Sequence, residues 1–151
     1  MIDAAGLKNP ANTAVLNQVL KGESSGYAEG LAAGDLLFAH VDGAGTVDTF
    51  GFVIFASSYK RFLGIDFSTP MIGNCNTLPA ARGRGLYPAL LQGCCAELAR
   101  RGYAEVVITC SPDNAPSIRG ITKAGFSRLH HLVVWIALSR LVLGRRVRAS
   151  S

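Results

Sequence analysis

Two arginines and two glycines alternate in a short segment whose chemistry suits an anion. The segment is Arg82-Gly83-Arg84-Gly85, and the apolar spacing after it predicts a helix to about Arg101. The first N–H groups of a helix have no internal partner, and the helix dipole adds partial positive charge there. Glycine lets a large anion approach the backbone, and the two guanidinium groups add charge. The combination fits a pyrophosphate.

The loop does not match two common nucleotide-binding patterns. No Gly-Lys-Ser/Thr follows the glycines, and the three-glycine spacing of a dinucleotide fingerprint is missing. A basic turn without a ligand would explain the loop equally well when it is taken alone. The interpretation therefore depends on a second group of residues, which are Asn114, Ser117 and Gly125-Phe126.

Together the two groups resemble the motifs of the GNAT superfamily of acyl-CoA-dependent N-acyltransferases. The family's loop reads Arg/Gln-x-x-Gly-x-Gly/Ala with a proline three residues ahead, and here Pro79 precedes Arg82–Tyr87. The family's second motif has Asn, a small residue three positions on, and Gly-Phe at positions eleven and twelve. Asn114, Ser117 and Gly125-Phe126 stand in that register. Tyr87 replaces the last Gly/Ala of the loop motif, as in a subset of the superfamily.

The resemblance covers about residues 71–138 and implies a fold and a co-substrate. The implied fold is α/β (α+β), a single GNAT-like domain with a mixed central sheet flanked by helices. The implied co-substrate is acetyl-CoA, with no metal. The residues implied to bind it are Thr77, Leu78, Arg82, Gly83, Arg84, Gly85, Leu86, Tyr87, Asn114 and Ser117.

The resemblance also implies how the coenzyme lies. The N–H groups of Gly83–Tyr87 would hold the pyrophosphate, and the pantetheine arm would pair like an added strand beside the strand that ends near Thr77-Leu78. In the family, that strand and the one that we expect at Tyr103–Cys110 splay apart, and the arm enters between them. Asn114 would contact the arm from the other wall.

The implied reaction is transfer of an acetyl group to a primary amine by direct attack of the neutral amine on the thioester. Many members carry a tyrosine seven residues after the Asn, which protonates the leaving thiolate. Here that position is Ile121, which has no proton to donate. Tyr87 and Ser117 are therefore the candidate catalytic residues, with water or unassisted departure of the thiolate as alternatives.

No acidic residue stands on the expected strand Met71–Thr77 to act as the general base. His40, Asp66 and His130 are the candidates elsewhere in the chain. Cys75 and Cys110 would permit a covalent acyl-cysteine route, but no base is evident beside either of them, so packing in the core is favoured.

Other functions remain open at this point. The missing tyrosine and base suggest an acyl-CoA-binding module without turnover, and the basic surface also permits an acyl carrier protein as donor. Arg145, Arg146 and Arg148 are the support for binding nucleic acid or an anionic membrane, but no aromatic stacking platform accompanies them. The acceptor pocket is expected at the early helices and the loop Ser57–Thr69, whose aromatic residues are Tyr59, Phe62 and Phe67.

The elements that must position these residues follow from the hydrophobic pattern. We expect helices after Asn9–Thr13 and near Tyr27–Ala33, and a hairpin with its turn at Asp42–Gly45. A mixed loop occupies Ser57–Ser68. The later elements are expected at Met71–Thr77 (strand), Leu86–Arg101 (helix), Tyr103–Cys110 (strand), Ala115–Lys123 (helix) and Leu129–Leu138 (strand). Met1–Asn9 shows no strong strand pattern.

Length and composition agree with this organisation. The chain has 151 residues, 49% of them hydrophobic, and a net charge of +5. We expect one domain over residues 1–144 and a basic tail over 145–151. Four cysteines without Cys-x-x-Cys spacing, no signal peptide and no apolar stretch long enough to span a bilayer indicate a cytoplasmic protein. The apolar stretch Leu132–Leu143 is a candidate homodimer contact.

Overall fold

The central sheet begins with the hairpin that the sequence predicted. The computed structural model describes residues 1–21, 25–137 and 141–149. Its four-stranded mixed sheet has the order β1-β2-β3-β4. The first three strands are antiparallel neighbours, and β4 pairs parallel with β3. The strands are β1 (Leu36–Val41), β2 (Val47–Ile54), β3 (Met71–Thr77) and β4 (Val107–Ile108).

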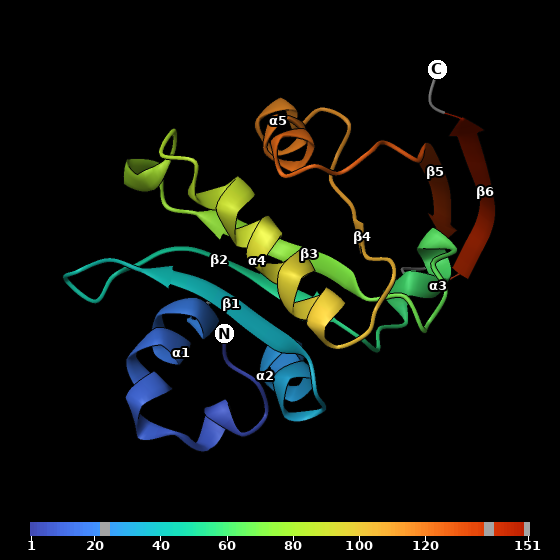
Figure 1. Cartoon of the computed structure of the whole chain (residues 1–151). Coiled ribbons are helices and arrows are strands. Elements are labelled where there is room, and N and C mark those ends of the chain that lie inside the picture. The colour runs from blue at the N-terminus through green and yellow to red at the C-terminus, as the bar shows by residue number, and fades with distance from the viewer. Residues whose placement is uncertain (22–24, 138–140, 150–151) are drawn as a thin grey trace.

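Helices cover both faces of this sheet (Figure 1). The helices α1 (Thr13–Leu20) and α2 (Ser25–Ala32) lie on one face, while α4 (Leu86–Arg100) and α5 (Ala115–Lys123) lie on the other. Short 3-10 turns precede α1 and α4, and they are η1 (Gly6–Lys8), η2 (Pro10–Asn12) and η3 (Pro79–Ala81). The mixed sheet flanked by helices confirms the predicted fold.

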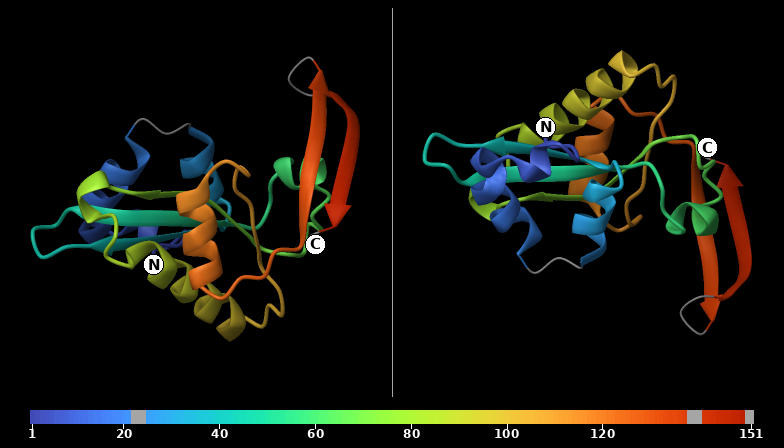
Figure 2. Two further views of the ribbon diagram at one scale, coloured as in Figure 1. Left: turned by 90° about the horizontal axis from the view of Figure 1, so that it is seen from above. Right: turned by 90° about the horizontal axis from the view of Figure 1, so that it is seen from below.

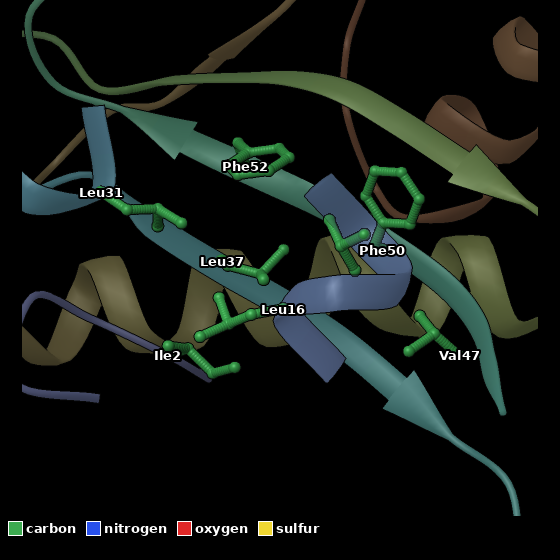
Figure 3. Close-up of a cluster of buried hydrophobic side chains, with 8 residues drawn as sticks. Ile2, Leu16, Leu31, Leu37, Val47, Phe50 and Phe52 are labelled. Atoms are coloured by element: carbon green, nitrogen blue, oxygen red, sulfur yellow. The ribbon is translucent and has the colours of Figure 1, made fainter. Parts of the chain in front are cut away.

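Each face of the sheet has its own hydrophobic core. On the α1 and α2 face, the buried cluster combines side chains from both helices and from β1 and β2 (Figure 3). On the other face, α4 contributes Leu91, Cys94 and Leu98, which pack against Leu36, Val53 and Ile72 of three strands. The alternation of side chains along the strands thus divides them between the two cores, which fixes the register of the sheet.

Two expected elements differ in the structure. The loop Ser57–Ser68 contains a short helix, α3 (Tyr59–Leu63), and Lys60 within it is fully buried. Its ammonium group donates to the carbonyl oxygens of Phe55, Phe67 and Thr69, which satisfies the buried charge with hydrogen bonds. The expected strand Tyr103–Cys110 is reduced to the two residues of β4, because β3 and β4 pair over two positions.

The last two strands form a separate sheet. β5 (His130–Ala137) and β6 (Leu141–Ala149) pair antiparallel and stand to one side of the central sheet (Figure 2). Residues 145–149, which were expected in a basic tail, belong to β6, where pairing with β5 supplies backbone partners. Residues 138–140, within the apolar stretch expected at the dimer contact, and residues 150–151 lie outside the described part of the chain.

The chain start reaches the sheet at Ile2. Ile2 is buried and forms an isolated antiparallel bridge with Leu37 of β1. This bridge takes the place of a full first strand, which agrees with the weak strand pattern of Met1–Asn9.

Candidate functional site

The glycine-rich loop ends in an open helix N-terminus. Gly83 and Gly85 have φ angles of 79° and 77°, in the left-handed region that favours glycine. Gly85 is the N-cap of α4, and among the described residues no side chain caps the first N–H groups. In the described chain no atom other than the glycines' immediate neighbours lies within 4 Å of a Cβ built on either glycine. The backbone from Gly83 to Leu86 and Tyr87 is therefore accessible to an anion.

Both loop arginines are tied to neighbouring strand ends. The Nε–H group of Arg82 donates to the carbonyl oxygen of Thr77 at 3.2 Å. The Nη1 atom of Arg84 lies 3.4 Å from Oδ2 of Asp48, near the start of β2. A guanidinium group has five N–H donors, so each arginine keeps donors that face outward. These contacts fix the loop and still leave positive charge for a ligand.

Asp48 was not among the residues that the sequence pattern indicated. Its side chain is 7% exposed, and Oδ2 lies 3.3 Å from Nδ1 of His40 as well as near Arg84. A nearly buried carboxylate requires such partners, because removing it from water is costly. A signal was present in the sequence, since Asp48 is the one charged residue of the strand VDTFGFVI.

The end of β3 has a paired side and a free side. Toward β2, the Thr77 hydroxyl hydrogen-bonds with that of Thr49 at 2.8 Å, and the N–H group of Leu78 donates to the carbonyl oxygen of Asp48 at 2.9 Å. Toward β4, pairing ends at Ile72 with Ile108. Within the described chain, no strand pairs with this side of β3 beyond Ile72. The free edge suits an extended chain that pairs as an added strand.

The side chains of Tyr87 and Ser117 meet between α4 and α5. Their hydroxyl oxygens are 3.3 Å apart. Burial raises the pKa of the half-buried Tyr87 hydroxyl to about 12, an effect that the hydrogen bond to Ser117 partly opposes. Tyr87 therefore keeps its proton at neutral pH. The two candidate catalytic residues are thus brought together, although they are 30 positions apart.

Asn114 and Ile121 have clear roles in α5. Asn114 is the N-cap of the helix, and its Oδ1 atom accepts the N–H group of Ser117 at 3.1 Å. The amide nitrogen of this exposed residue is left for a ligand. Ile121 packs against the hydrophobic core on the α4 side of the sheet, so its side chain has a structural role.

Gly120 makes room for Tyr87. A Cβ atom at Gly120, which is buried in α5, would collide with the ring of Tyr87. The close approach of α5 to Tyr87 therefore depends on a glycine here. The sequence pattern did not indicate Gly120, because nothing local distinguishes it from a helix residue of low propensity.

The candidate bases are dispersed. His40 lies beside Asp48, and Asp66 is exposed, accepting hydrogen bonds from the N–H and hydroxyl groups of Ser68. These hydrogen bonds lower the pKa of Asp66. The side chain of His130 lies outside the described residues. Burial raises the pKa of the Cys75 thiol to about 12, so a thiolate nucleophile is disfavoured there.

A cavity of about 950 Å³ lies along β4, on the side of α3 and α5. Tyr59, one of the three aromatic residues expected at an acceptor pocket, lines it, together with Ile118 and Ile121. Phe62 and Phe67 do not line it. Neither do the residues of the glycine-rich loop Arg82–Gly85, so the cavity is distinct from that loop.

The described residues contain no group of three or more His, Cys, Asp or Glu side chains placed to hold a metal ion. Across the same part of the chain, no helix has the length and apolar character needed to cross a membrane.

Comparison with known proteins identifies a family. The family model described as acetyltransferase (GNAT) family matches residues 27–126. No match was found among curated proteins.

Several solved structures share the fold. The aminoglycoside N-acetyltransferase AAC(6′)-Iy in complex with CoA is 20% identical, with a TM-score of 0.65 over 85% of this chain and 95% of that chain. The aminoglycoside 6′-N-acetyltransferase AAC(6′)-Ih from Acinetobacter baumannii is 14% identical, with a TM-score of 0.64 over 90% and 93% of the two chains. A predicted acetyltransferase from Clostridium acetobutylicum, solved with acetyl-CoA, is 16% identical, with a TM-score of 0.58 over 86% and 91%.

Proposed function

The chain belongs to the acetyltransferase (GNAT) family, and from this premise we propose that it transfers an acetyl group from acetyl-CoA to a primary amine by direct attack. The observation that carries the proposal is the open, glycine-rich N-terminus of α4 beside the free edge of β3. The first feature suits a pyrophosphate and the second an extended arm. Both are needed by an acyl-CoA, and they adjoin each other.

The residues present fit the coenzyme. The N–H groups of Gly83–Tyr87 lie at an uncapped helix end, and Arg82 and Arg84 add charge there. Thr77 lies at the end of the free edge of β3, and Asn114 keeps its amide nitrogen on the opposite wall. When bound, acetyl-CoA supplies a thioester that a neutral amine can attack.

Proton transfer to the leaving sulfur is assigned to Tyr87. Its hydroxyl is protonated at neutral pH, as any tyrosine hydroxyl is, and burial raises its pKa further, to about 12. Ser117, with its oxygen 3.3 Å away, holds this hydroxyl and gives it a route for reprotonation. The pair replaces the tyrosine that other family members carry at the position of Ile121, whose side chain belongs to the core here.

The acceptor is proposed to be a small amine of low charge. The names of two structural neighbours refer to aminoglycosides, which are polycations. This chain carries a net charge of +5, and its large cavity is lined by Arg128 and by no carboxylate among the described residues. A polycation would be repelled there, whereas a single amine on an apolar body would fit the lining of Tyr59, Leu63 and Ile118.

A homodimer is proposed through the β5–β6 hairpin. The hairpin stands outside the four-stranded sheet, and in the described chain no strand pairs with the outer edge of β4. An isolated two-stranded hairpin is marginally stable in water, and a second copy would supply it with a partner. Light scattering on the full chain should give twice the monomer mass of 15.9 kDa, and the monomer mass would contradict the dimer.

The test of the function is an acetylation assay. The full chain is incubated with acetyl-CoA and a panel of primary amines, and both free thiol and acetylated amine are measured. We expect thiol release that depends on the amine and matches the acetylated product. Tight binding of acetyl-CoA with no thiol release on any amine would instead support an acyl-CoA-binding module without turnover. Ile121 favours that alternative, because it stands where many family members carry the proton-donating tyrosine.

A further inference from the structure

A β-bulge at Asp48 interrupts the pairing of β1 with β2. His40 pairs with Thr49 and Val41 pairs with Val47, so Asp48 has no residue opposite it on β1. Bulges of this kind re-aim side chains and are common beside active sites. The bulge therefore marks Asp48 as a residue whose side chain is aimed at something other than the sheet.

The bulge changes which way the side chains of β2 face. Val47 and Phe50 both belong to the core on the α1 and α2 face, although residues three apart on a regular strand face opposite sides. Asp48 is the extra residue between them. Its side chain reaches the glycine-rich loop before α4, where Arg84 lies, and its carbonyl oxygen accepts the N–H group of Leu78.

One carboxylate oxygen of Asp48 is shared by two basic side chains. Oδ2 lies 3.3 Å from Nδ1 of His40 and 3.4 Å from Nη1 of Arg84. The side chain of Asp48 is nearly buried, whereas the other two are about half exposed. Because an ionised carboxylate only accepts hydrogen bonds, Nδ1 of His40 carries a proton, and Nε2 is the nitrogen that titrates.

The partner of His40 among the described residues is Asp48. Other ionisable side chains on the neighbouring elements are engaged within the β1–β2 turn, with the end of β3, with α5 and with arginines at the end of α4. They are Asp42, Arg82, Tyr87 and Glu97. A proton taken up by His40 therefore acts first on Asp48 and, through it, on Arg84.

The charge of this cluster depends on His40. With a neutral imidazole, the carboxylate of Asp48 and the guanidinium group of Arg84 offset each other. A proton on Nε2 makes the cluster more positive by one unit, because the imidazolium then offsets Asp48 while the carboxylate still holds Arg84 in place. An anion at the glycine-rich loop is attracted more strongly in that state.

We propose that His40 is a positioning residue of the coenzyme site, whose protonation offsets the charge of Asp48 and leaves that of Arg84 for the anionic coenzyme. The assignment rests on the coenzyme site proposed above. It differs in sign from a role as general base. A base acts while it is unprotonated, so catalysis would weaken as the pH falls, whereas the affinity for the coenzyme rises as the pH falls.

The test measures the dissociation constant of dephospho-coenzyme A by calorimetry at pH 6 and pH 8, the range in which histidine changes its charge. This probe keeps the pyrophosphate and lacks the phosphate monoester, which itself titrates in this range. The wild-type chain should bind it about threefold more tightly at pH 6. His40→Gln keeps an amide that can donate to Asp48 but does not titrate, and it should give equal constants at the two pH values.

Two further variants test the route and the specificity of this effect. Arg84→Gln removes the charge that His40 is proposed to release, so its constant should change less than about 1.5-fold between the two pH values. The matched control is His131→Gln, at a histidine of β5 in the second sheet, and it should keep the threefold effect of the wild type.

The outcomes separate this assignment from the proposed function. A threefold effect retained in His40→Gln would overturn the role of His40, and one retained in Arg84→Gln would overturn the route through this arginine. Equal binding by the wild type at both pH values would overturn the assignment and leave the proposed function in place. A wild type that binds neither dephospho-coenzyme A nor acetyl-CoA at either pH would overturn both.

Discussion

The guanidinium group of Arg84 lies 3.4 Å from the carboxylate of Asp48, a buried residue 36 positions earlier in the chain. This contact joins the glycine-rich loop Arg82–Gly85 to the start of β2. Arg84 is about half exposed, and Asp48 also contacts His40. The loop arginine is thus oriented by a carboxylate from another part of the sheet.

The first prediction concerns this pair. Asp48→Asn and Arg84→Gln should each lower the affinity for acetyl-CoA, because the first frees the arginine and the second removes its charge. In denaturant unfolding, the double-mutant cycle should give a coupling of about 0.5–1 kcal/mol, the size expected for a pair with one exposed partner. Strictly additive effects would show that the two side chains do not interact in solution.

Substitution of Tyr87 tests the assignment of the proton donor. Tyr87→Phe keeps the ring against Gly120 and removes the hydroxyl, so we expect kcat to fall about 100-fold with KM for acetyl-CoA nearly unchanged. The control is Tyr103→Phe, at an exposed tyrosine whose ring packs against Phe55. A kcat equal to the wild type in Tyr87→Phe would exclude Tyr87 as the donor.

Gly120 should be intolerant of a methyl group. Gly120→Ala places a Cβ against the ring of Tyr87, so activity and the free energy of unfolding should both decrease, the latter by about 1–3 kcal/mol. Gly93→Ala is the matched helix control, because no described atom beyond its own helix backbone lies within 4 Å of the new Cβ. That control should be neutral or up to about 1 kcal/mol more stable. Equal effects of the two changes would contradict the packing described for Gly120.

Stability should depend on pH through two buried thiols. Burial raises the pKa of Cys75 and of Cys94 from 9.0 to about 12. Because the folded state holds these protons more tightly, this stability is fully present below pH 9 and is lost as the pH rises toward 12. The free energy of unfolding should fall above pH 9 by about 1 kcal/mol per pH unit for each thiol.

Cys94→Ala should lower the steepness of that pH dependence by about one proton, whatever its effect on stability at neutral pH. Cys110→Ala, which removes an exposed thiol, should leave the steepness unchanged. A flat profile between pH 9 and 11 in the wild type would mean that the two thiols are not protected in solution.

Local features of the site could be predicted from the sequence. The glycines at 83 and 85, the helix that follows and the N-cap at Asn114 depend on short-range chemistry, and the structure has them where the pattern placed them. The contact of Tyr87 with Ser117 joins two helices and was not predicted, although both residues were named as candidates.

The remaining features depend on distant partners. The role of Asp48 depends on its contact with Arg84, and the need for glycine at position 51 depends on the side chain of Cys75 on the neighbouring strand. A strand of eight residues was expected at Tyr103–Cys110. The length of a strand depends on how far its neighbour pairs with it, and β3 pairs with β4 at two positions. The buried Lys60 could not be foreseen, because the three carbonyl oxygens that satisfy it come from the folded loop.

The most direct test of the account is the binding of acetyl-CoA, measured by thermal unfolding of the wild type, Gly85→Glu and Gly45→Glu. Gly45 has a φ angle of 84° in the β1–β2 turn, so its variant carries similar backbone strain away from the loop. At about 100 times the dissociation constant, acetyl-CoA should raise the melting temperature of the wild type by about 5–11 °C. The same shift is expected in Gly45→Glu and none in Gly85→Glu, whose carboxylate would repel the pyrophosphate. A full shift in a folded Gly85→Glu variant, or no shift in the wild type, would contradict the assignment of this loop as the coenzyme site.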